Sequence, residues 1–284
     1  MTAFASPLPS PRMRALTCWV LVALTLGLLC AAAGPAAAKK GPVRTTVTGS
    51  AGSVRATFVY TRASKHSVVT SLKRLDISRR GTPVLHDTLR RFRGFSPGGY
   101  RDQPTLKVAD LDGDGEPEVL LTLFTGGAHC CVDAEIYRYR AATSSYVRSE
   151  TNFASAGFRL RDLDGNGLLE FQTVDPAFED AFTSHAESVG PLQVLRLQSG
   201  RLADVTKAFP AQVRRDLVTL QRLYPRFRKR HADLRGLLAA TAAEEIVLGD
   251  TEARDATFVR ARKVGGAAFL GRLKRFLAKE GYRS

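Results

Sequence analysis

The sequence predicts a mainly β protein, in which blade-like antiparallel β units form an incomplete propeller-like assembly ahead of a C-terminal α-helical domain. Three observations support this fold class. Two acidic, glycine-containing loops begin 52 residues apart, at Asp110 and Asp162, and each lies between strand-like stretches. A strand–turn–strand pattern occurs three times before residue 206. Beyond it, apolar residues recur at helical spacing.

The first 38 residues have the pattern of a Sec signal peptide, which we expect to be cleaved after Ala38. Arg12 and Arg14 precede an apolar run from Leu16 to Ala33, and small residues follow. An uncleaved anchor is the alternative, since the run approaches the length of a membrane span. No later stretch is long enough to span a bilayer, so we expect a secreted or cell-surface protein with no transmembrane segment in the mature chain.

Residues 39–206 are expected to form the β domain. Residues 39–54 are polar and are interpreted as a loose start, and Val54–Tyr60 alternates like a half-buried strand. The strand–turn–strand copies begin near Val68, Ile136 and Leu192. Together with the strands that flank the acidic loops they suggest three four-stranded units, of which the first lacks an acidic loop. Three units are too few for a standard propeller ring, so an open assembly is predicted.

Each acidic loop has the composition of a calcium site. Oxygen-bearing groups at positions 1, 3, 5, 7 and 9 suit a hard cation, and glycines at positions 4 and 6 allow the backbone to curl around it. Position 7 contributes its carbonyl. The predicted ligands are Asp110, Asp112, Asp114, Glu116 and Glu118 in the first loop, and Asp162, Asp164, Asn166, Leu168 and Glu170 in the second.

These loops are not EF-hands, because position 12 is Leu121 or Thr173 rather than glutamate and because strands, not helices, flank them. A calcium loop between two strands, with its last carboxylate at position 9, resembles the FG-GAP or VCBS repeats of integrin-type β-propellers and secreted bacterial proteins. The resemblance implies two bound Ca2+ ions and a blade-like fold. It departs from the family at position 9, where the family usually has aspartate and this chain has glutamate.

The mature chain would keep two cysteines, Cys130 and Cys131, which are adjacent. A vicinal disulfide is predicted, with free thiols and metal or redox chemistry as alternatives. His129 precedes the pair, and thiolate and imidazole ligands suit zinc or copper. His185, in the acidic stretch 175–190, is interpreted as a solvated loop histidine rather than a base.

Residues 207–284 are expected to form a basic helical domain. They contain 18 lysine and arginine residues against 8 aspartate and glutamate residues, within a chain of net charge +15. We expect Pro225 to start or kink a new element, Thr251 to cap a helix and Gly265-Gly266 to interrupt it. The run 226–231 is a solvated helix face or a contact for an anionic cell-surface polymer. Export argues against a nucleic-acid partner.

Two functions from different classes are compatible with this sequence. The first is a secreted, calcium-binding, non-enzymatic β-repeat module that binds a protein or glycan ligand at or outside the cell surface. The second is an extracellular enzyme or redox protein centred on His129-Cys130-Cys131. The sequence shows no nucleophile elbow, phosphate loop or zinc-protease motif, and the glycine loops favour a structural ion over carboxylate catalysis.

Overall fold

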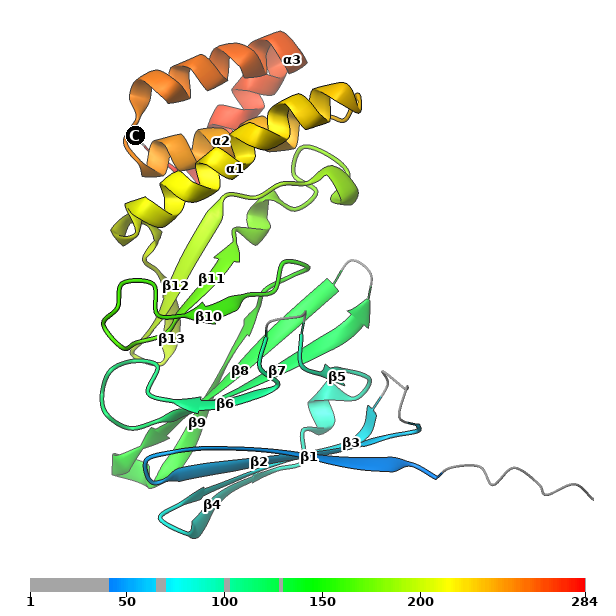
Figure 1. Ribbon diagram of the computed structural model, residues 1–284, viewed down its shortest axis with the longest axis vertical. Coiled ribbons are helices and arrows are strands. Elements are labelled where there is room, and N and C mark those ends of the chain that lie inside the picture. Colours follow the sequence, from blue (N-terminus) through cyan, green and yellow to red (C-terminus); the bar gives the residue numbers. More distant parts are fainter. Residues whose placement is uncertain (1–40, 65–69, 100–102, 128–129, 284) are drawn as a thin grey trace, which may run out of the picture. The chain divides into compact units, whose positions relative to one another are not determined.

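The β part of the chain consists of sheets whose strands follow one another along the sequence. The computed structural model describes residues 41–64, 70–99, 103–127 and 130–283. Within these ranges thirteen strands form three antiparallel sheets, which we name A, B and C, and a helical region follows (Figure 1). The predicted fold class is confirmed, and the described strands close neither a barrel nor a propeller. The expected signal peptide lies outside the described residues.

Sheet A is a four-stranded meander. Its strands are β1 (Val43–Ala51), β2 (Val54–Arg62), β3 (Thr70–Arg79) and β4 (Thr82–Asp87). The expectation of a loose start over residues 39–54 is therefore wrong for most of that stretch. β1 is polar because it is an edge strand, yet alternate residues such as Val47 are half-buried against the core. Ala51 pairs with Val54, so a two-residue turn stands where the other sheets carry an acidic loop.

Sheets B and C repeat this meander with an acidic loop after the first strand. Sheet B contains β6 (Leu106–Ala109), β7 (Glu118–Gly127), β8 (Cys130–Arg140) and β9 (Ser145–Asn152), and the two-residue β5 (Ser96–Pro97) also pairs with β7. Sheet C contains β10 (Arg159–Arg161), β11 (Glu170–Val174), β12 (Leu192–Gln198) and β13 (Arg201–Asp204). The three predicted blade-like units are these three sheets.

Buried side chains join neighbouring sheets. Phe58 and Leu75 of sheet A share one core with Val119 and Tyr137 of sheet B. On the same strands of sheet B, residues that point to the opposite face, such as Leu120, share a second core with sheet C. The middle sheet is thus covered on both faces, which explains why every residue from 119 to 124 in β7 is apolar except Thr122.

Three long helices form the C-terminal region: α1 (Pro210–Lys229), α2 (Arg235–Val247) and α3 (Thr251–Lys279). Contrary to expectation, α1 continues through Pro225. The side chains around it, including Leu220 and Tyr224, pack with α2, and this burial offsets the hydrogen bond that proline cannot donate. The cap of α3 is Asp250, not Thr251: its carboxylate accepts from the Ala253 N–H. Gly266, with φ 72°, interrupts α3 as predicted.

The helices pack on sheet C through apolar and polar contacts. Leu192 and Val194 of β12 bury against Phe209 and Val213 at the start of α1.

Short 3-10 helices, η1 to η5, cover Arg90–Phe92, Ala141–Thr143, Pro176–Phe178, His185–Glu187 and Thr206–Ala208. Across the described part of the chain, no helix combines the length and the hydropathy that a bilayer crossing requires.

Candidate functional site: two acidic loops

The two acidic loops adopt the same backbone structure, one between β6 and β7 and the other between β10 and β11. In the first, Asp110 accepts hydrogen bonds from the N–H groups of Gly113 and Gly115, at 2.7 and 2.9 Å. In the second, Asp162 accepts from Gly165 and Gly167 at the same distances. All four glycines have φ between 79° and 88°, a conformation that costs a side-chain-bearing residue energy. The curl that the glycine positions predicted is therefore present in both loops.

The buried glutamate at position 9 of each loop accepts a hydrogen bond from the backbone of the same loop. Glu118 and Glu170 are fully buried. One oxygen of Glu118 accepts from the Leu111 N–H at 2.8 Å, and one oxygen of Glu170 accepts from the Leu163 N–H at 2.9 Å. Both donors are position 2 of their loop. The additional methylene of glutamate, compared with aspartate, lets position 9 reach back across the loop to this N–H.

Three of the predicted side-chain ligands converge in each loop. Asp110, Asp112 and Glu118 each offer an oxygen within 4.8 Å of the others, and so do Asp162, Asp164 and Glu170. The side chains at position 5 make turn bonds instead: Asp114 accepts from the Glu116 N–H and Asn166 from the Leu168 N–H. The Glu116 carboxylate is paired with Arg79. Position 7 was expected to contribute only its carbonyl, so this pairing leaves that expectation untouched.

The loops also lie next to each other. A side chain on Gly113 would meet the Leu168 side chain, since an added Cβ would lie 3.2 Å from Leu168 Cδ1. Leu111 of the first loop and Leu169 of the second belong to the same core between sheets B and C. The packing of sheet B on sheet C therefore brings together two concentrations of negative charge.

Sequence reasoning missed two arginines that contact these loops. Val119 pairs with Tyr137 in sheet B, and Phe171 pairs with Leu195 in sheet C. The next residues, Arg138 and Arg196, therefore hold the same position relative to their loops. Arg138 donates to Asp112 and Asp114, both at 2.8 Å. A signal was present in the sequence, because an arginine stands at the same register position of both predicted strands.

The arginines make different contacts with the buried glutamates. Arg196 donates to Glu170 Oε1 at 2.9 and 2.6 Å and to Asp164 at 2.8 Å. By contrast, Glu118 Oε1 has no hydrogen-bond partner among the described residues. Burial, reinforced by the carboxylates of Asp112, Asp114 and Asp110, raises the pKa of Glu118 to about 8. The first loop thus contains a buried acceptor to which no described side chain or backbone group donates.

This arrangement fits Ca2+ chemically. Ca2+ takes six to eight oxygen ligands, and the first loop offers carboxylates, a carbonyl and an acceptor with no other partner. Asp110, Asp112 and Glu118 would hold the ion, with the remaining ligands drawn from Asp114, the Glu116 carbonyl and water. The ion would remove the repulsion that now disfavours the charged form of Glu118.

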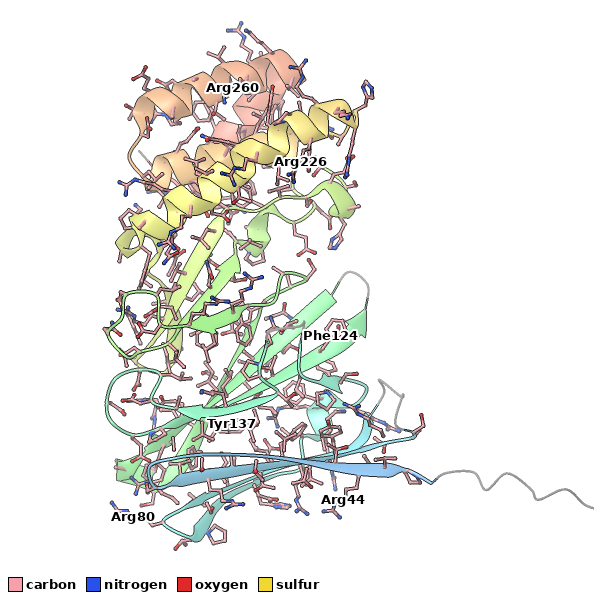
Figure 2. All side chains as sticks on the ribbon, viewed as in Figure 1. Arg44, Arg80, Phe124, Tyr137, Arg226 and Arg260 are labelled. Carbon is pink, nitrogen blue, oxygen red and sulfur yellow. The ribbon has the colours of Figure 1, made fainter. Side chains whose placement is uncertain are left out.

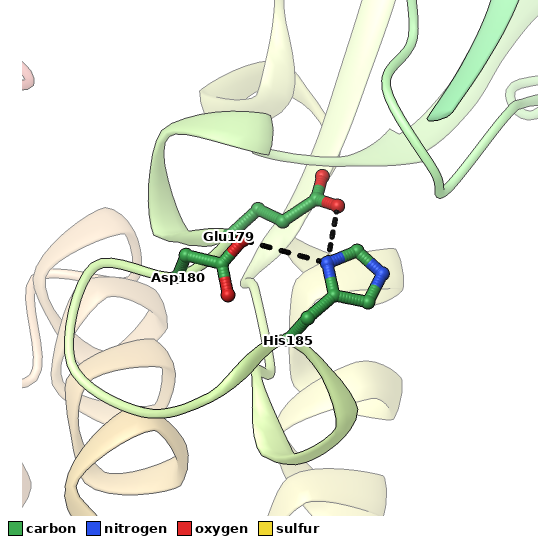
Figure 3. Close-up of side chains that lie close together, drawn as sticks. All are labelled: Glu179, Asp180 and His185. Atoms are coloured by element: carbon green, nitrogen blue, oxygen red, sulfur yellow. Dashed lines mark ion pairs between the residues drawn. The ribbon is translucent and has the colours of Figure 1, made fainter. Parts of the chain in front are cut away.

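A third group of ligand-type residues lies in the segment that links β11 and β12. His185 Nδ1 is 2.9 Å from Glu179 and 3.5 Å from Asp180 (Figure 3). Their ligand atoms lie within 4.8 Å of one another. His185 is therefore less solvated than expected, because its ring lies against two carboxylates and only 23% of the side chain is exposed, whereas the expectation that it is not a base stays a prediction.

The cysteine pair begins β8. Cys131 is buried, and its N–H donates to Thr125 Oγ1 at 2.7 Å. His129 and the side chain of Cys130 lie outside the described residues. β7 extends to Gly127, and Gly127 pairs with Cys130 at the start of β8. The vicinal disulfide stays a prediction.

Positive charge gathers at the end of α1. Arg226, Arg228, Lys229 and Arg230 are exposed, and Figure 2 shows Arg226 on this helix. Figure 2 also labels Arg260, which is exposed on α3. Within the described part of the chain, none of these five side chains forms an ion pair. The end of α1 therefore presents cationic groups without an ion pair among the described residues to solvent.

Comparisons with known proteins identify relatives but no family. No family model matches the sequence. The chain is 29% identical over 151 residues to a probable thylakoid lumen protein of Synechocystis, covering 52% of this chain and 44% of that protein. It is 30% identical over 184 residues to an uncharacterised protein of Sinorhizobium fredii, covering 63% of this chain and 28% of that protein. This chain therefore spans less than half the length of either relative.

One solved structure is similar in part. It is a Xanthomonas type IV secretion system related protein, 15% identical, and the match covers 56% of this chain and 92% of that one with a TM-score of 0.26.

Proposed function

We propose that this protein is an exported, calcium-stabilised β-repeat module that acts by binding rather than catalysis. The observation that carries the proposal is the buried Glu118 Oε1, which has no partner among the described residues and belongs to a loop whose ligand oxygens converge. An uncompensated buried acceptor is costly, and a bound cation removes that cost. The resemblance to FG-GAP and VCBS repeats supports the same assignment.

Calcium has a structural role in this proposal. One loop connects the paired strands β6 and β7, the other connects β10 and β11, and the two loops lie against each other between sheets B and C. An ion that binds only the folded loop stabilises the fold by mass action, by about 2.7 kcal/mol at a concentration 100 times its Kd. Extracellular modules can bind Ca2+ weakly, at about 0.1–1 mM, because the ion is abundant outside cells.

Export is supported by the signal-like pattern of the first 38 residues. It is also supported by similarity to a protein described as a probable thylakoid lumen protein. The chain would be delivered outside the cytoplasm, where a site of modest affinity is filled. Its ligand would be a protein or glycan, and the Cys130-Cys131 pair would be oxidised there.

The end of α1 suggests an anionic cell-surface polymer as one partner. Exposed guanidinium and ammonium groups without ion pairs attract polyanions, and such attraction weakens steeply with salt. Retention on an anionic matrix should fall as salt is raised and fall further when Arg226, Arg228 and Arg230 are changed to glutamine. Arg44→Gln, at the exposed start of β1, is the control. Retention that does not change with salt concentration would exclude an anionic polymer as the partner.

Calcium-dependent melting tests the central role. The protein should melt at a higher temperature in millimolar Ca2+ than in EDTA, and millimolar Mg2+ should give a smaller shift because it demands a tighter octahedral site. Asp112→Ala should remove the shift, whereas Asp255→Ala, an exposed acid of α3, should keep it. Identical melting of the wild-type protein in EDTA and in Ca2+ would refute the proposed role.

A further inference from the structure

The two acidic loops share a backbone structure but differ in how their buried glutamates are neutralised. In the second loop, the Arg196 guanidinium contacts Glu170 Oε1 at 2.6 Å and Asp164 Oδ2 at 2.8 Å. Its equivalent in the first loop, Arg138, contacts Asp112 and Asp114 but makes no hydrogen bond to Glu118. One loop therefore has an internal cation on its position-9 carboxylate, and the other does not.

A guanidinium can take the place of a metal ion as counterion to a carboxylate pair. It is planar, permanently charged and able to donate several hydrogen bonds in a fixed fork. Arg196 uses its Nε and one terminal nitrogen to bridge the carboxylates of positions 3 and 9. These are two of the three side chains whose oxygens converge in this loop. A calcium ion and this guanidinium would compete for the same oxygens.

The first loop also contains more carboxylates than the second. The first loop has five, from Asp110 to Glu118, and they face the guanidinium groups of Arg138 and Arg79. The second has three, because Asn166 stands at position 5 and Leu168 at position 7, and they face Arg196. Since calcium affinity rises with the number of charged ligands, the first loop is the stronger site on this ground as well.

We propose that Arg196 is a built-in counterion of the second loop, so that Ca2+ binds the first loop and reaches the second only when this guanidinium is displaced. The inference rests on the proposed calcium role and assigns the two loops different duties. The first loop responds to the ion. The second is held in the same shape by the protein's own charge, and it keeps sheet C folded when calcium is scarce.

Counting bound ions in the purified protein by isothermal titration calorimetry with CaCl2 tests this inference. The wild-type protein should bind one Ca2+ per chain. Arg196→Gln should bind two, because the Glu170 and Asp164 oxygens lose their competitor. Arg138→Gln is the matched control, an arginine removed from the same register position of the other loop, and it should still bind one.

Two results would overturn the inference. One is a wild-type protein that binds two ions of comparable affinity; the other is a folded Arg196→Gln variant that binds no more than the wild type. Binding of no ion by the wild-type protein and by Arg196→Gln alike would refute the calcium role itself. The two failures are therefore distinguishable.

A second measurement covers the case in which Arg196→Gln does not fold. Asp164→Ala leaves Arg196 its contact with Glu170 and should show the same calcium-induced rise in Tm as the wild type. Asp112→Ala should lose that rise. If both substitutions reduce it equally, the second loop binds Ca2+ as the first does and Arg196 is not its counterion.

Discussion

Glu244 of α2 accepts a hydrogen bond from the Leu192 N–H of β12 at 2.9 Å, which joins the helical region to sheet C. The side chain is buried, and its second oxygen has no hydrogen-bond partner among the described residues. Burial, followed by the neighbouring carboxyl of Asp216, raises the pKa of Glu244 to about 9. Burial thus favours the neutral form of Glu244, and its deprotonation would place a poorly compensated charge at the junction of the helices and sheet C.

Stability should fall as pH rises because of this group. Its pKa is higher in the folded than in the unfolded protein, so its contribution is fully present below pH 4.5 and is lost as pH rises toward about 9. Glu244→Gln keeps the shape and the acceptor oxygen without the titration. We expect its Tm to decline less between pH 5 and pH 9 than the wild-type Tm. The exposed Glu252→Gln variant should show the same decline in Tm between pH 5 and pH 9 as the wild type. The same decline in Glu244→Gln would contradict this role of Glu244.

Replacing the glutamate at position 9 with glutamine should change the stability of the protein differently in the two loops. In EDTA, Glu118→Gln should be as stable as the wild type or more so, because it removes a carboxyl group whose charged form is disfavoured by burial, but it should lose the response to Ca2+. Glu170→Gln breaks the ion pair with Arg196 and should lose about 1–3 kcal/mol with or without the ion. Urea unfolding of both variants in EDTA and in Ca2+ measures this. Equal losses in EDTA would contradict the difference between the loops.

The cap of α3 offers a local test of the helical region. Asp250→Ala removes the acceptor for the Ala253 N–H and should cost about 1 kcal/mol, or about 2–4 °C in Tm for a chain of this size. Thr251→Ala is the control, since the sequence favoured Thr251 as the cap but the structure assigns that role to its neighbour. A larger loss from Thr251→Ala would reverse the assignment.

The cysteine pair should be oxidised in the exported protein. We expect no alkyl group on Cys130 or Cys131 when the unfolded protein is alkylated without reductant, and two groups after reduction, as read by intact mass. Replacement of both cysteines with serine should leave calcium-dependent melting intact, because neither residue belongs to an acidic loop. Alkylation of both thiols without reduction would exclude the vicinal disulfide.

The sequence predicted features that depend on local chemistry. The glycines of the acidic loops, the alternation in β2 and the interruption of α3 at Gly266 are each determined by neighbouring residues. Prediction from the sequence failed where contacts with residues distant in the chain determine the local structure. The polar strand β1 forms because β2 pairs with it, and Pro225 is tolerated because α2 packs against the same turn.

The candidate site follows the same rule. The carboxylates were recognisable from their spacing. The arginines whose contacts distinguish the two loops, however, lie 20 residues or more further along the chain. Their role depends on strand register, which relates Arg138 to the first loop and Arg196 to the second. A comparison of the two repeats at matched register would have found them.

The most direct test of the account is a crystal structure of the protein grown in Ca2+, with a lanthanide soak to give an anomalous signal. We predict a peak in the first loop at 2.3–2.6 Å from oxygens of Glu118, Asp110 and Asp112, with the second loop still closed by Arg196 on Glu170. Clear density for the first loop with no peak at millimolar ion, and Glu118 Oε1 bound by water or a side chain instead, would contradict the central claim.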